Sequence, residues 1–164
     1  MESCQCKTTQ SASIQEIEQL HLQLAQALQT TTWNHEQAVQ LIQKSTAYAA
    51  AYPTDSRTPT YLFRAADLAR GIGKYQQAIE LWKEVEEKYA TFEKTPEAIF
   101  FQGFTYENHL SDIQKAQQHY RDFLRQYPTH KLRPTVEQSL LQLSDTPMDL
   151  IKQFERKRHQ REKQ

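Results

Sequence analysis

The chain has 164 residues, a length typical of one domain with room for a hydrophobic core. Lys and Arg total 20 and Asp and Glu total 20, so the formal net charge of +0 creates no global field that would attract nucleic acid or anionic lipid. Only 3 glycines stand against many Gln, Ala, Leu and Glu residues, and this composition favours helix. We therefore expect an all-α protein that does not bind nucleic acid.

No apolar run approaches the roughly 18 residues that a membrane-spanning helix needs, so we expect no transmembrane segment. The sequence opens with Met1-Glu2 rather than with a positively charged and apolar leader. As written, it therefore predicts no signal peptide, and a cytoplasmic location if it is complete.

Residues 1–12 are polar and show no hydrophobic periodicity, so they are predicted to form a flexible N-terminal tail. Cys4 and Cys6 supply two thiolates where a closed zinc site needs four ligands, and no nearby His or further Cys completes the set. We interpret the two cysteines as free thiols or an oxidation product rather than as metal ligands.

A diverged first repeat is predicted over residues 13–52. Ser13 and Glu16 have the spacing of a capping box, which predicts that a helix begins at Ser13. Its apolar positions share one face: Ile17, Leu20, Leu24 and Leu28. A second helix is predicted to begin near Asn34, with Trp33 before it as a hydrophobic staple. The residues that it is expected to bury are Ala38, Leu41, Ile42 and Tyr48.

Residues 58–90 and 95–128 contain the same helical hairpin twice. A Thr-Pro pair opens each copy, and the two threonines, Thr58 and Thr95, lie 37 residues apart. Each threonine is a candidate N-cap followed by proline at the first helical position. The second helices repeat an apolar face at i, i+4 and i+7: Ala78, Trp82 and Val85, then Ala116, Tyr120 and Phe123. This period with two helices per unit is typical of a stacked repeat.

The two copies resemble the tetratricopeptide repeat, whose pattern runs Trp, Leu-Gly, Tyr, Ala, Phe, Ala and Pro. The matching residues of the second copy are Ile99, Gly103, Tyr106, Ala116, Tyr120, Phe123 and Pro128. Those of the first copy are Leu62, Ala66, Ala69, Ala78, Trp82, Val85 and Ala90. The small residues Ala66 and Gly103 are predicted to let paired helices approach closely. The resemblance implies a right-handed superhelical stack of antiparallel helix pairs, a tetratricopeptide-like α-solenoid.

A narrower resemblance covers roughly residues 34–155. The phrases Tyr-Pro, Pro-Glu-Ala and Lys-Tyr-x-x-Ala-Ile resemble bacterial envelope repeat proteins of the Tol-Pal coordinator and outer-membrane-assembly lipoprotein type. This resemblance implies a periplasmic or outer-membrane-associated location. Ser3-Cys4 would suit the end of a lipoprotein signal, but Met1-Glu2 is not the apolar stretch that such a signal requires.

The repeat domain is predicted to span residues 13–155 and to close with a capping helix pair at residues 134–155. The first helix of the pair shows an apolar face: Val136, Leu140 and Leu143. Thr146 and Pro147 are predicted to open the second, whose apolar residues are Leu150, Ile151 and Phe154. Residues 156–164 form a basic C-terminal tail, which we interpret as a solvated helix end rather than a nucleic-acid site.

Catalytic motifs are absent from the sequence. It contains neither a G-x-S-x-G nor a P-loop, and its six histidines form no pair with metal-ligand spacing. Acidic residues alternate with Lys and Arg on polar helix faces, where solvated ion pairs are the ordinary explanation. We expect no enzyme activity, no cofactor and no metal.

What remains is binding of another protein. In stacked helix pairs, the first helix of each repeat lines the inner surface. The family geometry implies that six residues face this groove: Phe63, Asp67 and Arg70 in the first central repeat, and Phe100, Phe104 and Glu107 in the second. Packing of the phenylalanines against the neighbouring repeat is the alternative. Repeats that clamp acidic chaperone tails carry Lys and Asn at four of these positions, which this chain does not, so that role is disfavoured.

Two functional hypotheses follow. The first is a protein-protein interaction scaffold that holds a peptide segment or partner protein in the groove, within a bacterial cell-envelope assembly. The alternative is a structural protein that acts through self-association of its repeats.

Overall fold

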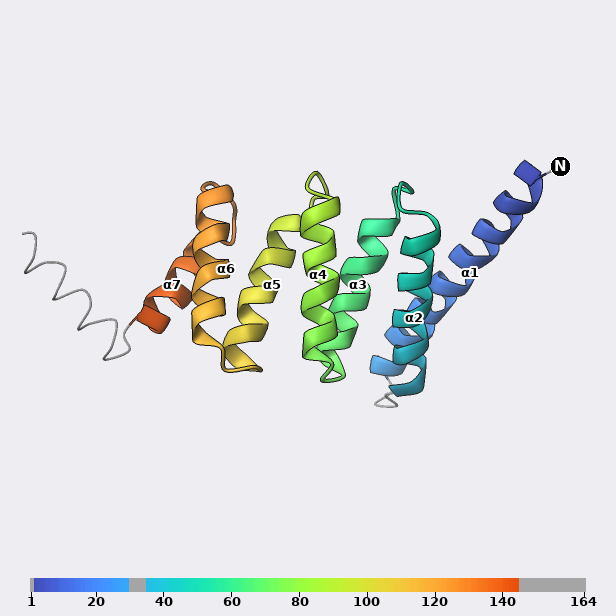
Figure 1. Ribbon diagram of the computed structural model, residues 1–164. Helices are drawn as coiled ribbons and strands as arrows, with labels where there is room; N and C mark the ends of the chain where they lie inside the picture. Colours follow the sequence, from blue (N-terminus) through green and yellow to red (C-terminus); the bar gives the residue numbers. More distant parts are fainter. Residues whose placement is uncertain (1, 30–34, 145–164) are drawn as a thin grey trace, which may run out of the picture. The chain divides into compact units, whose positions relative to one another are not determined.

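The computed structural model describes residues 2–29 and 35–144, and these residues form helices and connections without any strand (Figure 1). The seven helices are α1 (Glu2–Gln29), α2 (His35–Ala51), α3 (Thr58–Gly71), α4 (Tyr75–Lys88), α5 (Thr95–Asn108), α6 (Ile113–Gln126) and α7 (Arg133–Ser144). The all-α prediction is confirmed. The chain divides into two compact units, Met1–Ala98 and Ile99–Gln164.

In the first unit, each helix packs against the next one along the chain: α1 on α2, α2 on α3 and α3 on α4 (Figure 1). One hydrophobic cluster joins the first three helices, and its buried members are Ile17, Leu24, Ala38, Leu41, Tyr48 and Tyr61. The rings of Tyr48 and Tyr61 meet edge to face with their centroids 5.2 Å apart. The predicted inner faces of the first two helices therefore form a real core.

The apolar faces of the second helices are buried as predicted. Trp82 and Val85 on α4 are fully covered, as are Tyr120 and Phe123 on α6, and the alanines at 78 and 116 share this burial. In the second unit α6 packs against α7, where the Gln117 side chain donates a buried hydrogen bond of 2.9 Å to the carbonyl of Leu143. The i, i+4 and i+7 spacing of the apolar residues on α4 and α6 was sufficient to predict their burial, because this spacing places them on one face of a helix.

The role predicted for the two threonines is wrong. The Thr58 hydroxyl does not accept a helix N–H; it donates a hydrogen bond of 2.6 Å to the carbonyl of Tyr52. Thr95 donates likewise to the carbonyl of Tyr89, at 2.8 Å. Both hydroxyls are buried, and each ties the start of a helix to the end of the helix before it. Pro59 does lie in the first turn of α3, where its missing N–H costs no hydrogen bond.

The predicted start of the first helix is also wrong. α1 begins at Glu2, so it includes residues 2–12, which the sequence analysis assigned to a tail. Ser13 therefore lies inside the helix, where its hydroxyl donates to the carbonyl of Thr9 at 3.0 Å instead of capping an N-terminus. No Gly or Pro interrupts residues 2–29, and Gln10 is held by hydrogen bonds to Tyr48 and Asp55.

Several predictions fall outside the described residues. They concern the side chains of Cys4 and Cys6, the staple at Trp33, the last helix from Thr146 onward and the basic tail of residues 156–164. The described part of α2 begins at His35, next to the predicted start. Among the residues that the structure describes, no helix has both the length and the apolar character needed to cross a membrane.

Candidate functional site

A pocket of about 720 Å³ opens in the first unit between α1 and α3. Helix α1 contributes His21, Leu24 and Ala25, helix α2 contributes Leu41, and helix α3 contributes Arg64, Asp67, Leu68 and Gly71. Its volume lies in the range of pockets that enclose a ligand. The two first helices of adjacent hairpins thus supply all but one of the lining residues.

Two of the residues that line the pocket, Ala25 and Gly71, are small. A Cβ atom built on Gly71 would meet no other atom within 4 Å, so the end of α3 faces open space. Ala25 on α1 is exposed and presents only a methyl group. Leu24 and Leu41 are buried in the core cluster and form an apolar floor. The result is a mainly apolar cavity with an open mouth.

Charged side chains stand around this floor. Asp67 and Arg70 form an ion pair at 3.7 Å, and both remain partly exposed. Burial raises the pKa of the Asp67 carboxyl, while the nearby charges of Arg70 and Lys94 oppose that change. Arg64 lies 3.8 Å from Glu18 on α1, and the Glu18 carboxylate accepts a hydrogen bond of 2.8 Å from the Tyr61 hydroxyl.

His21 is the titratable group on the α1 wall. Burial lowers the pKa of its imidazole, the positive charge of Arg64 lowers it further, and Glu18 partly offsets both. His21 is therefore neutral at pH 7, since its ordinary pKa of 6.5 already lies below that pH. The α1 wall accordingly contributes no positive charge of its own.

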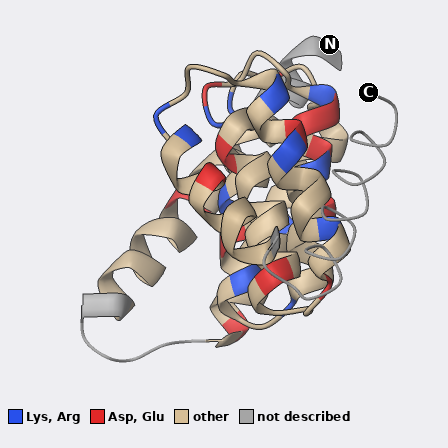
Figure 2. Ribbon diagram, turned by 90° about the vertical axis from the view of Figure 1, so that its left-hand side faces the viewer, with Lys and Arg blue, Asp and Glu red and all other residues tan. Residues whose placement is uncertain are grey.

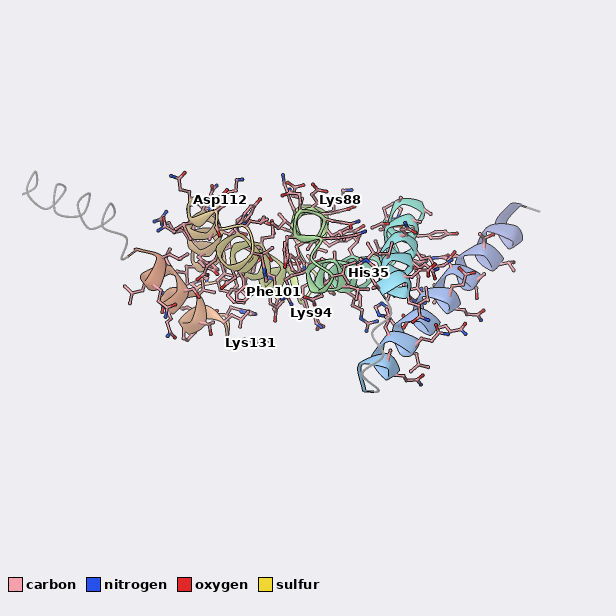
Figure 3. The ribbon with its side chains drawn as sticks, turned by 90° about the horizontal axis from the view of Figure 1, so that it is seen from below. His35, Lys88, Lys94, Phe101, Asp112 and Lys131 are labelled. Carbon is pink, nitrogen blue, oxygen red and sulfur yellow. The ribbon has the colours of Figure 1, made fainter. Side chains whose placement is uncertain are left out.

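The groove residues predicted for the first unit lie in two environments. Asp67 lines the pocket, and Arg70 is its ion-pair partner. Phe63 is only 6% exposed, because Phe92 packs on its ring edge to face at 6.3 Å. The ammonium group of Lys94 lies 5.5 Å from the centre of the same ring. In Figure 3, Lys94 lies on the α3 side of this unit, whereas Lys88 lies on the α4 side.

In the second unit, the predicted groove residues Phe100, Phe104 and Glu107 all lie on α5, and the two phenylalanine rings are neighbours. The Phe100 ring stacks on Tyr120 at 6.0 Å and lies 6.1 Å from Phe104, whose own ring meets His109 edge to face. Glu107 accepts a hydrogen bond from the Tyr120 hydroxyl, and burial together with this bond raises the pKa of that hydroxyl. All three predicted residues are partly exposed.

Sequence reasoning found only one residue of the pocket wall as a site residue, namely Asp67. Leu24 and Leu41 were predicted as core. The remaining members were not singled out as site residues: His21, Ala25, Arg64, Leu68 and Gly71. A signal was present in the small side chains at 25 and 71, but only the packing of α1 beside α3 shows that they face one cavity.

A comparison with protein families finds a match to the two central helical hairpins. The family model for the tetratricopeptide repeat matches residues 60–91 and 97–130. Both central hairpins are therefore similar to tetratricopeptide repeats. The seven helices of the described residues, packed in consecutive pairs, are those of a tetratricopeptide-like α-solenoid. A comparison with curated proteins finds no match to the chain.

Tetratricopeptide repeats generally mediate protein–protein interactions and are typically non-catalytic. In Figure 2, basic and acidic residues are interspersed along the described helices. The formal net charge of +0 agrees with this mixture and gives no long-range field of one sign.

Proposed function

We propose that this protein is a non-catalytic interaction scaffold that binds a peptide segment of a partner protein in the pocket between α1 and α3. The observation that carries the proposal is the open cavity of about 720 Å³ with an apolar floor and charged rim residues. Its walls come from the first helices of adjacent hairpins, which is the surface that tetratricopeptide repeats present on their inner side.

The floor suits an apolar anchor from the partner. Leu24, Leu41 and Leu68 offer hydrocarbon surface, and a leucine-sized side chain that leaves water stabilises a complex by roughly 1.5–3 kcal/mol. Leu24 and Leu41 are held in place by the core cluster, so little ordering entropy is lost on binding. A preformed cavity of this kind concentrates affinity in a few side chains.

The partly exposed charged residues then define the edge of the site. We assign Asp67 and Arg70 to the rim of the pocket, where they orient the bound segment. Phe104 and Glu107, half-buried on α5, form a separate contact surface within the second unit. Phe63 and Phe100 support these surfaces, because each ring is packed against other aromatic side chains.

The partner is proposed to belong to a bacterial cell-envelope assembly. This part rests on the resemblance of the Tyr-Pro, Pro-Glu-Ala and Lys-Tyr-x-x-Ala-Ile phrases to envelope repeat proteins. The neighbouring genes provide the test. Envelope components beside this gene support the assignment, whereas neighbours that all serve cytoplasmic metabolism would remove it and leave the peptide-binding proposal intact.

Gly71 offers a direct test of the pocket. Because a side chain at this position enters open space, Gly71→Trp is expected to fill the cavity without disturbing the fold. Gly71→Ala is the matched control, since it adds one methyl group and leaves most of the cavity open. A library of displayed 12-residue peptides is selected on the wild-type chain, and the selected peptides are then titrated against both variants.

We expect the affinity of the selected peptides to fall at least about tenfold on Gly71→Trp, which corresponds to about 1.4 kcal/mol. Gly71→Ala should bind them as the wild type does, and both variants should keep the wild-type helical circular dichroism spectrum. Peptides that bind all three chains equally would show that the pocket is not the binding site.

A further inference from the structure

We infer that the pocket between α1 and α3 selects segments in which an acidic residue accompanies the apolar anchor, and that Arg64 is the residue that pairs with the ligand's carboxylate. The inference rests on the proposed function and adds the chemistry of the partner. It follows from the way in which the charges around the pocket are already engaged.

Among the described residues, the one ion pair that the structure gives Arg64, with Glu18, is long. The Arg64 side chain is 48% exposed, and its ion pair with Glu18 spans 3.8 Å, which is longer than a hydrogen bond. Glu18 is meanwhile engaged by the hydroxyl of Tyr61 at 2.8 Å. The guanidinium at the pocket wall can therefore donate hydrogen bonds to a carboxylate of the ligand that approaches more closely than Glu18 does.

The acidic side of the rim is occupied in a different way. Asp67 is paired with Arg70 and lies near Lys94, so its carboxylate already faces two cations. Burial also opposes ionisation of Asp67, since its pKa is raised. A basic ligand would have to compete with those cations and approach Arg64, whereas an acidic ligand competes only for the long Arg64–Glu18 pair, and Glu18 keeps its hydrogen bond from Tyr61.

The positive potential of Arg64 also reaches the opposite wall. Its charge is one of the causes that lower the pKa of His21 on α1. The charged groups that these contacts join are three cations, Arg64, Arg70 and Lys94, and two anions, Glu18 and Asp67, so the group as a whole carries one positive charge more than it carries negative charges. A negatively charged segment complements that excess.

The geometry also sets the spacing within the ligand. Arg64 and Leu68 are both on α3 and differ by four positions, so their Cβ atoms lie about 5–6 Å apart on one face of the helix. An extended segment advances about 3.3 Å per residue, so its acidic residue would lie about two positions from the apolar anchor. A helical segment would place the two about one turn apart.

Arginine is suited to this task, because its planar fork can donate two parallel hydrogen bonds to one carboxylate. The position is also new with respect to the family resemblance. Arg64 is not among the positions where repeats that clamp acidic tails carry Lys or Asn, and those positions hold other residues in this chain. Recognition of acid here would depend on Arg64 and on the neighbouring apolar floor together.

The test uses the peptides selected on the wild-type chain from the random 12-residue library. We expect them to carry Asp or Glu within four residues of Leu, Ile, Met or Phe. Arg64→Glu should weaken their binding at least about tenfold. The same peptides with that acid replaced by Lys should bind Arg64→Glu better than they bind the wild type.

Lys83→Glu is the control for net charge, since Lys83 is an exposed residue of α4 whose ion pair with Glu87 is solvated. It should leave peptide binding unchanged. Circular dichroism on Arg64→Glu checks that the fold is kept, and recovery of binding by the Lys-substituted peptide cannot come from an unfolded chain.

The outcomes separate this inference from the function on which it rests. Peptides that lose binding on Gly71→Trp but not on Arg64→Glu, or that lack acidic residues, would overturn the acidic selectivity and leave the pocket as the binding site. A library that yields no peptide sensitive to Gly71→Trp would overturn both.

Discussion

Gly103 on α5 lies so close to Tyr120 on α6 that a Cβ atom at position 103 would be 2.7 Å from the tyrosine ring. Tyr120 cannot move away easily, because its ring is fully buried and stacks on Phe100, and its hydroxyl donates a hydrogen bond to Glu107. The small residue predicted at this position is thus required by a specific contact.

Gly103→Ala should therefore destabilise the protein by about 1–3 kcal/mol through overpacking, although alanine is the better helix former. Urea unfolding followed by circular dichroism measures the change. Gly71→Ala is the paired control, since nothing lies within 4 Å of its added methyl group, and it should be neutral or slightly stabilising. Equal stability of the two variants would contradict the contact.

Thr58 provides a second test, because its hydroxyl donates to the carbonyl of Tyr52. Thr58→Val removes this donor and should cost about 0.5–1.5 kcal/mol, the usual net value of a hydrogen bond. Thr58→Asp separates the two possible roles. A carboxylate is a good N-cap but would face a carbonyl oxygen here, so it should also destabilise; a stable Thr58→Asp variant would restore the capping interpretation.

The effect of replacing Phe63 depends on whether its ring packs in the core or contacts a bound peptide. With 6% of its surface exposed and Phe92 against its ring, we expect Phe63→Ser to lower the melting temperature. Trp82→Ala is the reference for a core truncation and should cost about 3–5 kcal/mol. If Phe63→Ser instead weakens peptide binding without loss of stability, the ring belongs to the groove.

His21 makes the docking of α1 sensitive to acid. The pKa of His21 is lowered in the folded state by burial and then by Arg64, so below pH 6.5 the unfolded chain takes up a proton before the folded chain does. Stability should fall as the pH drops from 6.5 to the folded-state pKa, and then level off. His21→Gln removes this dependence.

Thermal unfolding at pH 7.5 and pH 5.5 provides the measurement for wild type and His21→Gln. The wild type should lose more stability between the two values than the variant does, because the contributions of the other histidines cancel in the comparison. An equal loss in both chains would mean that the His21 imidazole is not held in the way the structure shows.

Sequence patterns predicted the parts of the fold that depend on local periodicity. The faces that carry Trp82 and Tyr120 were assigned correctly because burial at i, i+4 and i+7 follows from helix geometry alone. The role of Thr58 was wrong, because a hydroxyl can both donate and accept, and its partner is set by the connection six residues upstream.

Tertiary contacts decided the features that the sequence did not predict. Residues 2–12 were assigned to a tail because they lack apolar periodicity, yet α1 includes them and Gln10 is fixed by Tyr48 and Asp55. The pocket is lined by residues of both α1 and α3, among them the small residues Ala25 and Gly71. A cavity between two helices leaves no periodic pattern in either of them.

The claim that an apolar anchor enters the pocket is tested most directly by the methyl NMR spectrum of the full chain during titration with a selected 12-residue peptide. The account predicts that the methyl signals of Leu24, Leu41 and Leu68 shift and show contacts to the peptide, while those of the exposed Leu110 and Leu141 in the second unit stay in place. Shifts confined to Leu110 and Leu141, with the three pocket leucines unchanged at saturation, would contradict it.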